Sequence, residues 1–192
     1  FVSPKWVPQL ADAADLLALL DQPEGVRMPV LVPNDKGLNR ALDAGVKEIA
    51  VFGSATETFA QKNLNRRVAE SLEMFRPVVD RARAVGLAVR GYLSMCWGDP
   101  WEGEVDPHVV AGHARTLFDL GITELSLADT LGVATHGRVL GLLEALGQQA
   151  IAPDQPAGPF PATPRPRPPH RPPAPHHAPP VAHATRRGPG GA

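Results

Sequence analysis

Polar side chains that can move protons or hold oxygen atoms follow several short apolar runs of the sequence. Asp129 and Thr130 come directly after the run at residues 125–128, and Tyr92, the only tyrosine, lies near the end of another run. An Asp at such a point can assist proton transfer or orient an arginine, and Tyr or Thr hydroxyls can hydrogen-bond a carboxylate. Further polar segments follow apolar runs at residues 3–5, 33–35 and 53–55.

The elements that would position these side chains follow from the period of the apolar residues, which switches repeatedly between strand-like and helix-like. Strands are predicted at residues 28–33, 48–53, 87–93 and 124–128. Helices are predicted at residues 10–20, 35–44, 106–121 and 136–149, and a long helix starts at Asn63 or Asn65, is kinked at Pro77 and ends at Gly86. Asn34, Asp106 and Thr135 are suitable N-caps for three of these helices.

The strict alternation of apolar strands with helices predicts an α/β fold with a parallel sheet. Two architectures fit this order, the TIM β/α barrel and the open doubly wound sheet. The sequence has no glycine-rich nucleotide fingerprint after its first strand, which weakens the open sheet without excluding it. In both folds the residues after each strand gather at one edge of the sheet, where we expect the chemistry.

Composition divides the chain into two parts. Residues 1–151 contain eight of the 22 prolines and carry a net charge of −5, whereas residues 152–192 contain the other fourteen and carry +4. Phe160 and Val181 are the only large apolar side chains of the second part, which is too few to offset the entropy of ordering it. We predict a folded domain at residues 1–151 and a disordered Pro/Arg/His-rich tail at 152–192.

Several classes of function are disfavoured by the composition. The single cysteine, Cys96, cannot form an internal disulfide and is typical of a reducing compartment, so we predict a cytoplasmic location. No apolar run approaches the ~18–20 residues of a membrane span, which predicts no membrane partner. The basic tail lacks interleaved aromatic residues, which predicts no nucleic-acid site.

Seven segments resemble the 3-hydroxy-3-methylglutaryl-CoA lyase family in order and spacing. The stretch Phe-Val-Ser-Pro-Lys-Trp-Val-Pro-Gln at residues 1–9 resembles the end of the family's second strand, and Gln-Lys-Asn-Leu-Asn at 61–65 points to the same family. The remaining similar segments lie at residues 29–34, 52–57, 89–94, 99–103 and 124–132. The Asp-Thr-x-Gly pattern at 129–132 alone is shared with related synthases, such as isopropylmalate and homocitrate synthases.

The resemblance implies a partial TIM barrel containing strands two to six, and cleavage of 3-hydroxy-3-methylglutaryl-CoA to acetyl-CoA and acetoacetate. It also implies a divalent cation, Mg²⁺ or Mn²⁺, and a homo-oligomer in the intact family protein. The family's metal ligands are an Asp after strand one, a His-x-His-Asp segment on strand seven and a late Asn. None of these ligands matches a position of this sequence, so no metal ligand is assigned. The chain is therefore expected to be truncated at both ends, and to be inactive alone.

The resemblance also suggests roles for five residues. Asp129 is predicted to be catalytic, and four residues are predicted to bind the acyl-CoA substrate: Asn63, Tyr92, Ser126 and Thr130. Each has a purely structural alternative: a helix N-cap for Asn63, a rim aromatic for Tyr92, a core serine for Ser126, and a capped turn for Asp129 and Thr130. Cys96 is expected to be a buried thiol, and Trp97 and Trp101 are expected to close a loop by packing.

Three hypotheses for function remain open at this point. The first is a lyase of the stated family that is active in its full-length form. The second is another reaction of the superfamily, in which a synthase joins an acyl-CoA to a 2-oxo acid. The third is a non-catalytic fragment whose Pro-rich tail binds a partner. We further hypothesise that the tail is an out-of-frame product of a GC-rich gene.

Overall fold

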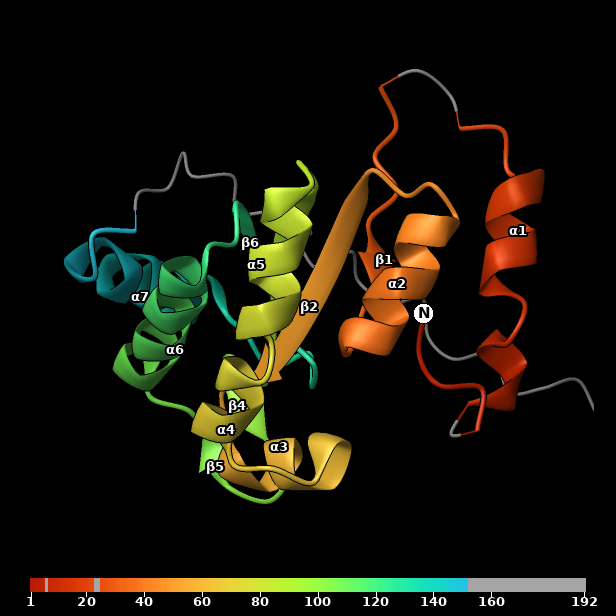
Figure 1. Ribbon diagram of the computed structural model, residues 1–192. Helices are drawn as coiled ribbons and strands as arrows, with labels where there is room; N and C mark the ends of the chain where they lie inside the picture. Colours follow the sequence, from red (N-terminus) through yellow and green to blue (C-terminus); the bar gives the residue numbers. More distant parts are fainter. Residues whose placement is uncertain (6, 23–24, 152–192) are drawn as a thin grey trace, which may run out of the picture. The chain divides into compact units, whose positions relative to one another are not determined.

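The main sheet consists of four parallel strands (Figure 1). The structure, a computed structural model, describes residues 1–5, 7–22 and 25–151. The strands are β1 (Val30–Leu31), β2 (Glu48–Ser54), β3 (Ala88–Ser94) and β6 (Glu124–Leu127). The predicted tail and the domain boundary before it involve residues outside the described part, so both remain predictions.

Helices connect the strands along the chain. A short 3-10 helix (Pro8–Leu10) and α1 (Ala13–Leu19) precede the sheet. The remaining helices are α2 (Asp35–Asp43), α3 (Glu57–Leu64), α4 (Val68–Glu73), α5 (Arg76–Ala84), α6 (Pro107–Leu120) and α7 (His136–Gln148). The three predicted N-caps are confirmed, because the side chains of Asn34, Asp106 and Thr135 accept bonds from Gly37, His108 and Arg138 backbone N–H groups.

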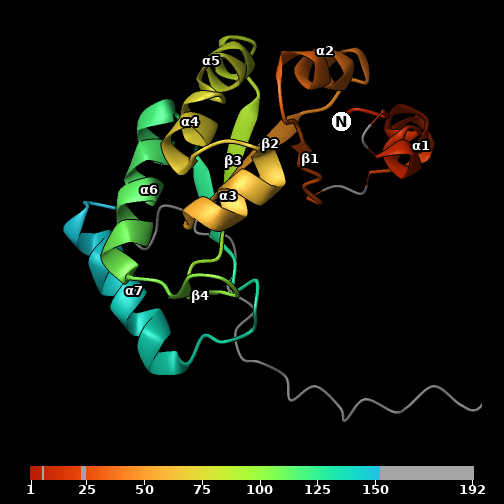
Figure 2. The ribbon, with the colours of Figure 1, turned by 90° about the horizontal axis from the view of Figure 1, so that it is seen from below.

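The strand order separates the two architectures that the sequence allowed. The strands lie in the order β1-β2-β3-β6, which is their order in the chain. A doubly wound sheet reverses its order at a switch point and carries helices on both faces. In Figure 2 helices α2, α5 and α6 instead form an arc along one side of the sheet. The described residues therefore form part of the wall of a β/α barrel, as predicted.

Alternation along β3 gives the sheet two different faces. Val89 and Leu93 are fully buried, and a Cβ added to Gly91 would lie 2.6 Å from Cδ1 of Ile122, so this face packs closely under the helices. Arg90 and Tyr92 point to the opposite face and are half-buried. This second face, called the concave face below, corresponds to the interior of a closed barrel.

The predicted helix from Asn63 to Gly86 is wrong in its start and its continuity. Asn63 lies inside the last turn of α3, so the N-cap alternative for Asn63 is also wrong, and Asn65 ends α3 in a left-handed conformation (φ +53°). A new helix, α4, begins at Val68 and ends at Glu73. Pro77 then lies in the first turn of the next helix, α5. Proline has no N–H to donate and its ring crowds the preceding turn, so the chain breaks here instead of kinking.

A small antiparallel hairpin, which the sequence did not predict, follows β3. Its strands are β4 (Gly98–Asp99) and β5 (Gly103–Glu104).

At the other edge of the main sheet, strand β1 is shorter than predicted. Residue 1 lies beside β1, because the backbone nitrogen of Phe1 donates to the carbonyl of Leu31 at 2.6 Å.

Within the described ranges, none of the helices combines the length and the apolar character needed to cross a bilayer.

Candidate functional site

Tyr92 and Ser126 bring two hydroxyl groups to the concave face. They are partners in the register between β3 and β6, so their side chains lie on the same side of the sheet. Both are half-buried. The structure thus brings together two of the predicted substrate-binding residues, and it disfavours the alternative of a fully enclosed core serine for Ser126.

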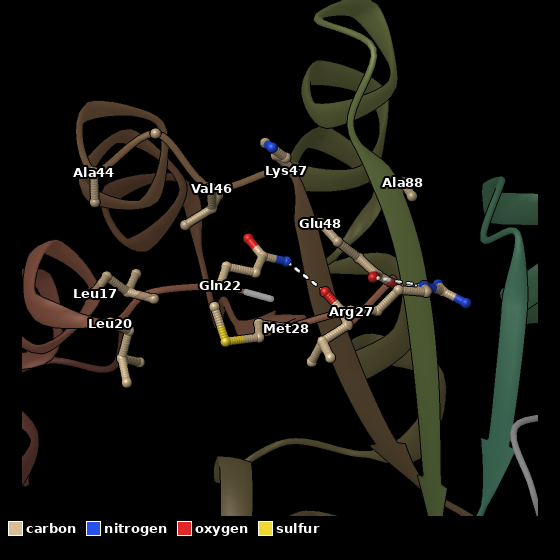
Figure 3. A pocket seen from close by; sticks show the side chains of 12 residues that line it. Leu17, Leu20, Gln22, Arg27, Met28, Ala44, Val46, Lys47, Glu48 and Ala88 are labelled. Carbon is tan, nitrogen blue, oxygen red and sulfur yellow. Dashed lines mark hydrogen bonds and ion pairs between the residues drawn. The ribbon is translucent and has the colours of Figure 1, made fainter. Parts of the chain in front are cut away.

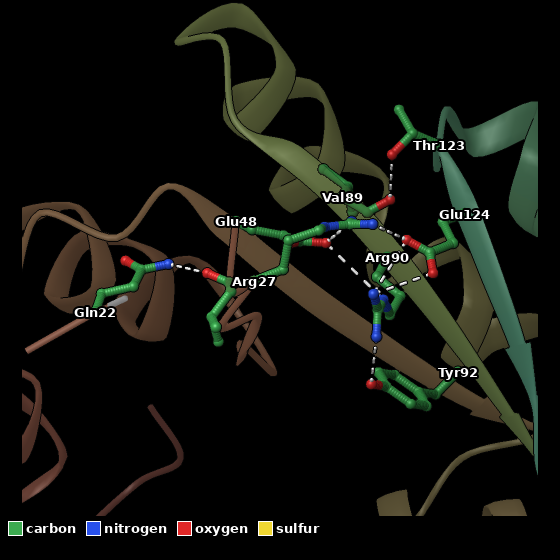
Figure 4. Close-up of polar contacts among 9 residues, drawn as sticks. Gln22, Arg27, Glu48, Val89, Arg90, Tyr92, Thr123 and Glu124 are labelled. Carbon is green, nitrogen blue, oxygen red and sulfur yellow. Dashed lines mark hydrogen bonds and ion pairs between the residues drawn. The ribbon is translucent and has the colours of Figure 1, made fainter. Parts of the chain in front are cut away.

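The hydroxyl of Tyr92 is engaged by Arg90, which precedes it by two residues on β3. Nη1 of Arg90 donates to the phenol oxygen at 3.3 Å, and Figure 4 shows both side chains on the same side of the sheet. The phenol oxygen therefore has a partner within the protein, and a role for Tyr92 in binding substrate stays a prediction.

Arg90 belongs to a four-residue charge network at the amino ends of the strands, formed by Arg27, Glu48, Arg90 and Glu124 (Figure 4). Nη2 of Arg90 lies 3.0 Å from Oε1 of Glu124, and Nη1 of Arg27 lies 2.7 Å from Oε2 of the same carboxylate. Glu48 and Glu124 are 6% and 3% exposed, and two arginines balance their charges. Burying a charged group is costly unless it is paired with an opposite charge.

Asp129 lies directly beyond the carboxyl end of β6, as predicted, and its carboxylate holds the loop that follows. Oδ1 accepts from the backbone nitrogens of Gly132 and Val133, both at 3.0 Å, and Oδ2 accepts from that of Ala134 at 2.8 Å. The capped-turn alternative is confirmed for Asp129. A carboxylate offers about four acceptor sites, so one site on Oδ2 remains for a further donor.

Thr130 joins the end of β6 to the end of β3. Its Oγ1 accepts from the backbone nitrogen of Met95 at 3.0 Å. Met95 has a φ of +61°, which is unusual for a residue with a side chain. Such strained conformations often occur at functional sites. The Thr130 side chain is exposed and keeps its own proton for donation.

Asp99 ties the β4–β5 hairpin to the end of β2. Oδ2 accepts from the Thr56 hydroxyl at 2.6 Å, and Oδ1 accepts from the backbone nitrogens of Trp101 (2.7 Å) and Glu102 (3.0 Å). Burial raises the pKa of the Asp99 carboxyl, but these three hydrogen bonds outweigh it and hold the pKa below its usual value.

Arg138, in the first turn of α7, connects the same edge of the sheet to the loop after β6. Its guanidinium donates to the carbonyls of Val133 and Trp97 and pairs with Glu104 of β5 at 3.1 Å. Trp97 is 4% exposed, and its indole N–H donates to the Arg138 carbonyl at 3.3 Å. The expected packing role is confirmed for Trp97, whereas Trp101 is 54% exposed and does not close the loop.

Asn63 stands apart from this group. Its side chain is exposed on α3, and its neighbour Lys62 places its ammonium 4.8 Å from the centre of the Trp101 ring. The structure does not bring Asn63 onto the concave face with Tyr92 and Ser126, so a role for Asn63 in binding substrate remains a prediction.

Cys96 is the buried thiol that was predicted. It is 1% exposed, and its Sγ donates to the Leu93 carbonyl at 3.0 Å. Desolvation by burial raises the pKa of the thiol to about 12, which disfavours the reactive thiolate.

A metal site is not formed by the described residues alone, which contain no group of three or more His, Cys, Asp or Glu side chains arranged to hold an ion. The two best-placed carboxylates, Asp99 and Asp129, each accept three hydrogen bonds from the protein. These side chains therefore do not fit a metal centre by themselves.

A cavity of about 340 Å³ lies at the opposite end of the strands (Figure 3). Its walls include Leu17 of α1, Val46 before β2, and the first residues of β2 and β3, Glu48 and Ala88. Catalytic groups in β/α barrels lie at the carboxyl ends of the strands. This cavity lies at their amino ends, so it is not where the predicted chemistry would take place.

Sequence reasoning did not assign a role to Arg90 or Asp99. A charged side chain within an apolar strand was the available signal for Arg90, and its partner Glu124 begins the next strand of the sheet. Asp99 lies between Gly98 and Pro100, a pattern typical of a turn, so its burial depends on the hairpin that it holds.

The fold and the placement of polar groups define the class of protein. A parallel sheet in chain order, with hydroxyl and carboxylate groups on its concave face and at the carboxyl ends of its strands, is the arrangement of a β/α-barrel enzyme. The family model described as HMGL-like matches residues 6–155, which is most of the chain. The chain therefore belongs to the HMGL-like family.

Similar proteins agree with this assignment. The chain is 47% identical over 149 residues to the mitochondrial hydroxymethylglutaryl-CoA lyase of Bos taurus and 48% identical to the 3-hydroxy-3-isohexenylglutaryl-CoA/hydroxy-methylglutaryl-CoA lyase of Pseudomonas aeruginosa. These matches cover 78% of the chain but only 46% and 50% of the two relatives. The chain thus spans about half the length of the curated relatives it matches.

Solved structures give the same result. The HMG-CoA lyase of Brucella melitensis superposes with a TM-score of 0.75 at 48% identity, covering 80% of this chain and 53% of that one. An HMG-CoA lyase from Acenitobacter baumannii, in complex with coenzyme A and 3-methylmalate, has a TM-score of 0.73 at 28% identity and covers 81% of this chain and 50% of that one.

Proposed function

We propose that the protein containing this chain is a carbon–carbon lyase that cleaves 3-hydroxy-3-methylglutaryl-CoA to acetyl-CoA and acetoacetate. The observation that carries the proposal is the 47–48% identity over 149 residues to proteins named as lyases of this substrate class. In the reaction, the tertiary hydroxyl loses its proton and its carbon–oxygen bond becomes a ketone. The adjacent carbon–carbon bond breaks, and the electron pair forms a thioester enolate that takes up a proton.

The residues around the strand ends fit three tasks of this reaction. Tyr92 and Ser126 present hydroxyl donors on one face, suited to the carboxylate or the developing ketone oxygen of the acyl group. Thr130 offers a further donor. Its hydroxyl oxygen accepts from the Met95 N–H group, and its hydroxyl proton is left to donate to another partner. The remaining acceptor site of Asp129 is suited to the substrate hydroxyl, whose proton it would accept or direct.

The family implies a divalent cation, Mg²⁺ or Mn²⁺, which when bound would stabilise charge on the hydroxyl and carbonyl oxygens. The described residues do not form its site, so we assign no ligand and derive no step through it. The coenzyme A portion would extend toward α3 and Asn63. That placement rests on the resemblance alone, whereas a structural neighbour in complex with coenzyme A supports only the acyl-CoA class of substrate.

The test is a comparison of two assays on the product of the intact gene, with Mg²⁺ or Mn²⁺ supplied. Release of acetoacetate from 3-hydroxy-3-methylglutaryl-CoA supports the proposal. Condensation of acetyl-CoA with a 2-oxo acid, without cleavage activity, would instead identify a synthase of the same superfamily. Oligomeric state stays a prediction. A cytoplasmic location does too, because similar proteins include both the mitochondrial lyase of Bos taurus and a cytoplasmic 3-hydroxy-3-methylglutaryl-CoA lyase of Rattus norvegicus.

A further inference from the structure

Arg90 is placed on the concave face with one part of its guanidinium group directed at Tyr92. Nη1 donates to the phenol oxygen at 3.3 Å, while Nη2 contacts both carboxylate oxygens of Glu124 at 3.0 and 3.2 Å. The Arg90 side chain is 17% exposed. One group thus spans the distance between a buried carboxylate and the hydroxyl predicted to meet substrate.

The carboxylates that hold Arg90 are themselves fixed. Glu48 and Glu124 are the first residues of β2 and β6, and Arg27 bridges them from outside, with Nε 2.9 Å from Oε2 of Glu48 and Nη1 2.7 Å from Oε2 of Glu124. Three strands and the segment before β1 therefore limit the positions that the Arg90 guanidinium can take. Such restraint from supporting residues is what keeps a functional side chain in one geometry.

The direction of the Arg90–Tyr92 hydrogen bond determines what the phenol can do. Arginine has only donors, so the Tyr92 oxygen must be the acceptor and its single proton is left for another partner. The charge of Arg90 also polarises the phenol O–H group and makes it a stronger donor.

We propose that Arg90 is a positioning residue that fixes the Tyr92 hydroxyl as a hydrogen-bond donor to an oxygen of the acyl group. This inference rests on the proposed function, which supplies the acyl substrate. The oxygen is a carboxylate, a carbonyl or a developing ketone oxygen, because each of these accepts and none needs to donate.

A double-mutant cycle in the product of the intact gene tests whether Arg90 acts through Tyr92. We expect R90Q to lower kcat/KM for thioester cleavage about 10- to 100-fold in the wild-type background, because a misplaced donor loses transition-state contact. Y92F should lower it at least as much. In the Y92F background, R90Q should have an effect within about twofold, since the hydroxyl it positions is gone.

A control variant tests whether the loss of an arginine alone has this effect. R81Q removes an arginine that bonds Asp35 and Asn39 and belongs neither to the charge network nor to the Tyr92 contact, so we expect its kcat/KM to stay within about twofold of wild type. If R90Q costs the same in both Tyr92 backgrounds, or if R81Q matches R90Q, Arg90 only stabilises the fold and the proposal is wrong.

A second readout does not depend on activity. Tyr92 is the only tyrosine of the 192-residue chain, so incorporation of 3-fluorotyrosine gives one ¹⁹F resonance that reports on this ring. We expect R90Q to move the resonance toward that of the denatured chain and R81Q to leave it in place. A resonance that R90Q does not move overturns the positioning role even if cleavage is observed. A resonance that moves, while the product of the intact gene shows no cleavage, leaves the positioning intact and rejects the proposed function.

Discussion

Asp99 connects the β4–β5 hairpin to β2 through one carboxylate, and its loss should be costly. The carboxylate is 3% exposed and accepts three hydrogen bonds, of which D99N would preserve at most part. We expect D99N to lower the free energy of unfolding at pH 7 by about 1–3 kcal/mol. Urea denaturation at low protein concentration, followed by tryptophan fluorescence, measures this change.

The pH dependence of this effect has a definite sign. The pKa of Asp99 is lowered in the folded state from an ordinary value of 3.8, so its contribution is complete above that value and is lost as pH falls through the folded pKa. The stability difference between wild type and D99N should therefore shrink below pH 3.8. D35N is the control, because the Asp35–Arg81 pair is about half exposed and should contribute only ~0–1 kcal/mol. Equal losses in the two variants would contradict the prediction.

Cys96 should be unreactive in the folded protein. Burial raises the pKa of its thiol to about 12, so only about one molecule in ten thousand carries a thiolate at pH 8 even before access is considered. We expect negligible labelling by a thiol reagent at pH 8 and rapid labelling in denaturant. Since Cys96 is the only cysteine, labelling is unambiguous. Labelling of the native protein at the rate of a free thiol would show that the end of β3 opens.

At the residue level, the sequence predicted the positions of the candidate site residues better than it predicted their hydrogen-bond partners. Tyr92, Ser126, Asp129 and Thr130 were predictable because each lies at or near the end of an apolar strand. The Arg90–Tyr92 bond was not predictable, since it depends on the side-chain path taken by a guanidinium that Glu124 holds from another strand. Nor did spacing reveal that Asp129 would accept three backbone hydrogen bonds.

Among the elements, β3 depends on the absence of a side chain at Gly91. A Cβ there would lie 2.6 Å from Cδ1 of Ile122 and 3.4 Å from Cδ1 of Leu125, both buried side chains beneath the helices. We expect G91A to lower the free energy of unfolding by about 1–3 kcal/mol through overpacking. Thermal or urea unfolding measures it.

Gly112 is the matched control for this substitution. It lies inside α6, and a Cβ there would meet nothing within 4 Å. G112A should stabilise the protein by about 0.5–1 kcal/mol, because alanine has the higher helix propensity. If G91A proves neutral, the sheet and its helices are less closely packed than the structure indicates.

The helix between β2 and β3 shows why boundaries were harder to predict than faces. The spacing of three and four predicts one buried face for Leu64, Val68, Leu72, Phe75, Val79 and Ala82, and all of them are buried except Leu64, which is partly exposed. The same spacing would persist across a break, so it could not reveal that α4 ends at Glu73 and α5 begins at Arg76. Only Pro77 marked the discontinuity, and its effect depends on how the flanking turns pack.

Across the whole molecule, the alternation of strands and helices predicted a parallel sheet but left two strand orders open, and only the resemblance to the family favoured the barrel. The charge network at the amino ends of β2, β3 and β6 could not be predicted from the sequence, because its members come from four separate segments. Arg27, Glu48, Arg90 and Glu124 meet only after the sheet has formed.

The state of the 192-residue chain in solution follows from its sheet edges. Among the described residues, β6 pairs with a strand on one side only, and β1 has a single hydrogen bond from Phe1 along its outer side. A barrel removes its strand edges by closing, and an open edge is a template for pairing with another chain. Leu16 and Leu19 of α1 are also exposed, at 53% and 84%. We therefore expect the isolated chain to associate or precipitate as its concentration rises.

Light scattering coupled to size-exclusion chromatography checks this expectation, with the longer product of the intact gene as the control. The mean mass of the isolated chain should rise with concentration, because edge pairing and apolar contact are both intermolecular and have no fixed stoichiometry. The longer protein should give one concentration-independent mass, because additional strands would cover both edges. A monodisperse monomer of the isolated chain that unfolds cooperatively would show that four strands and the helices on one side suffice for a stable domain, and it would remove the basis for this prediction.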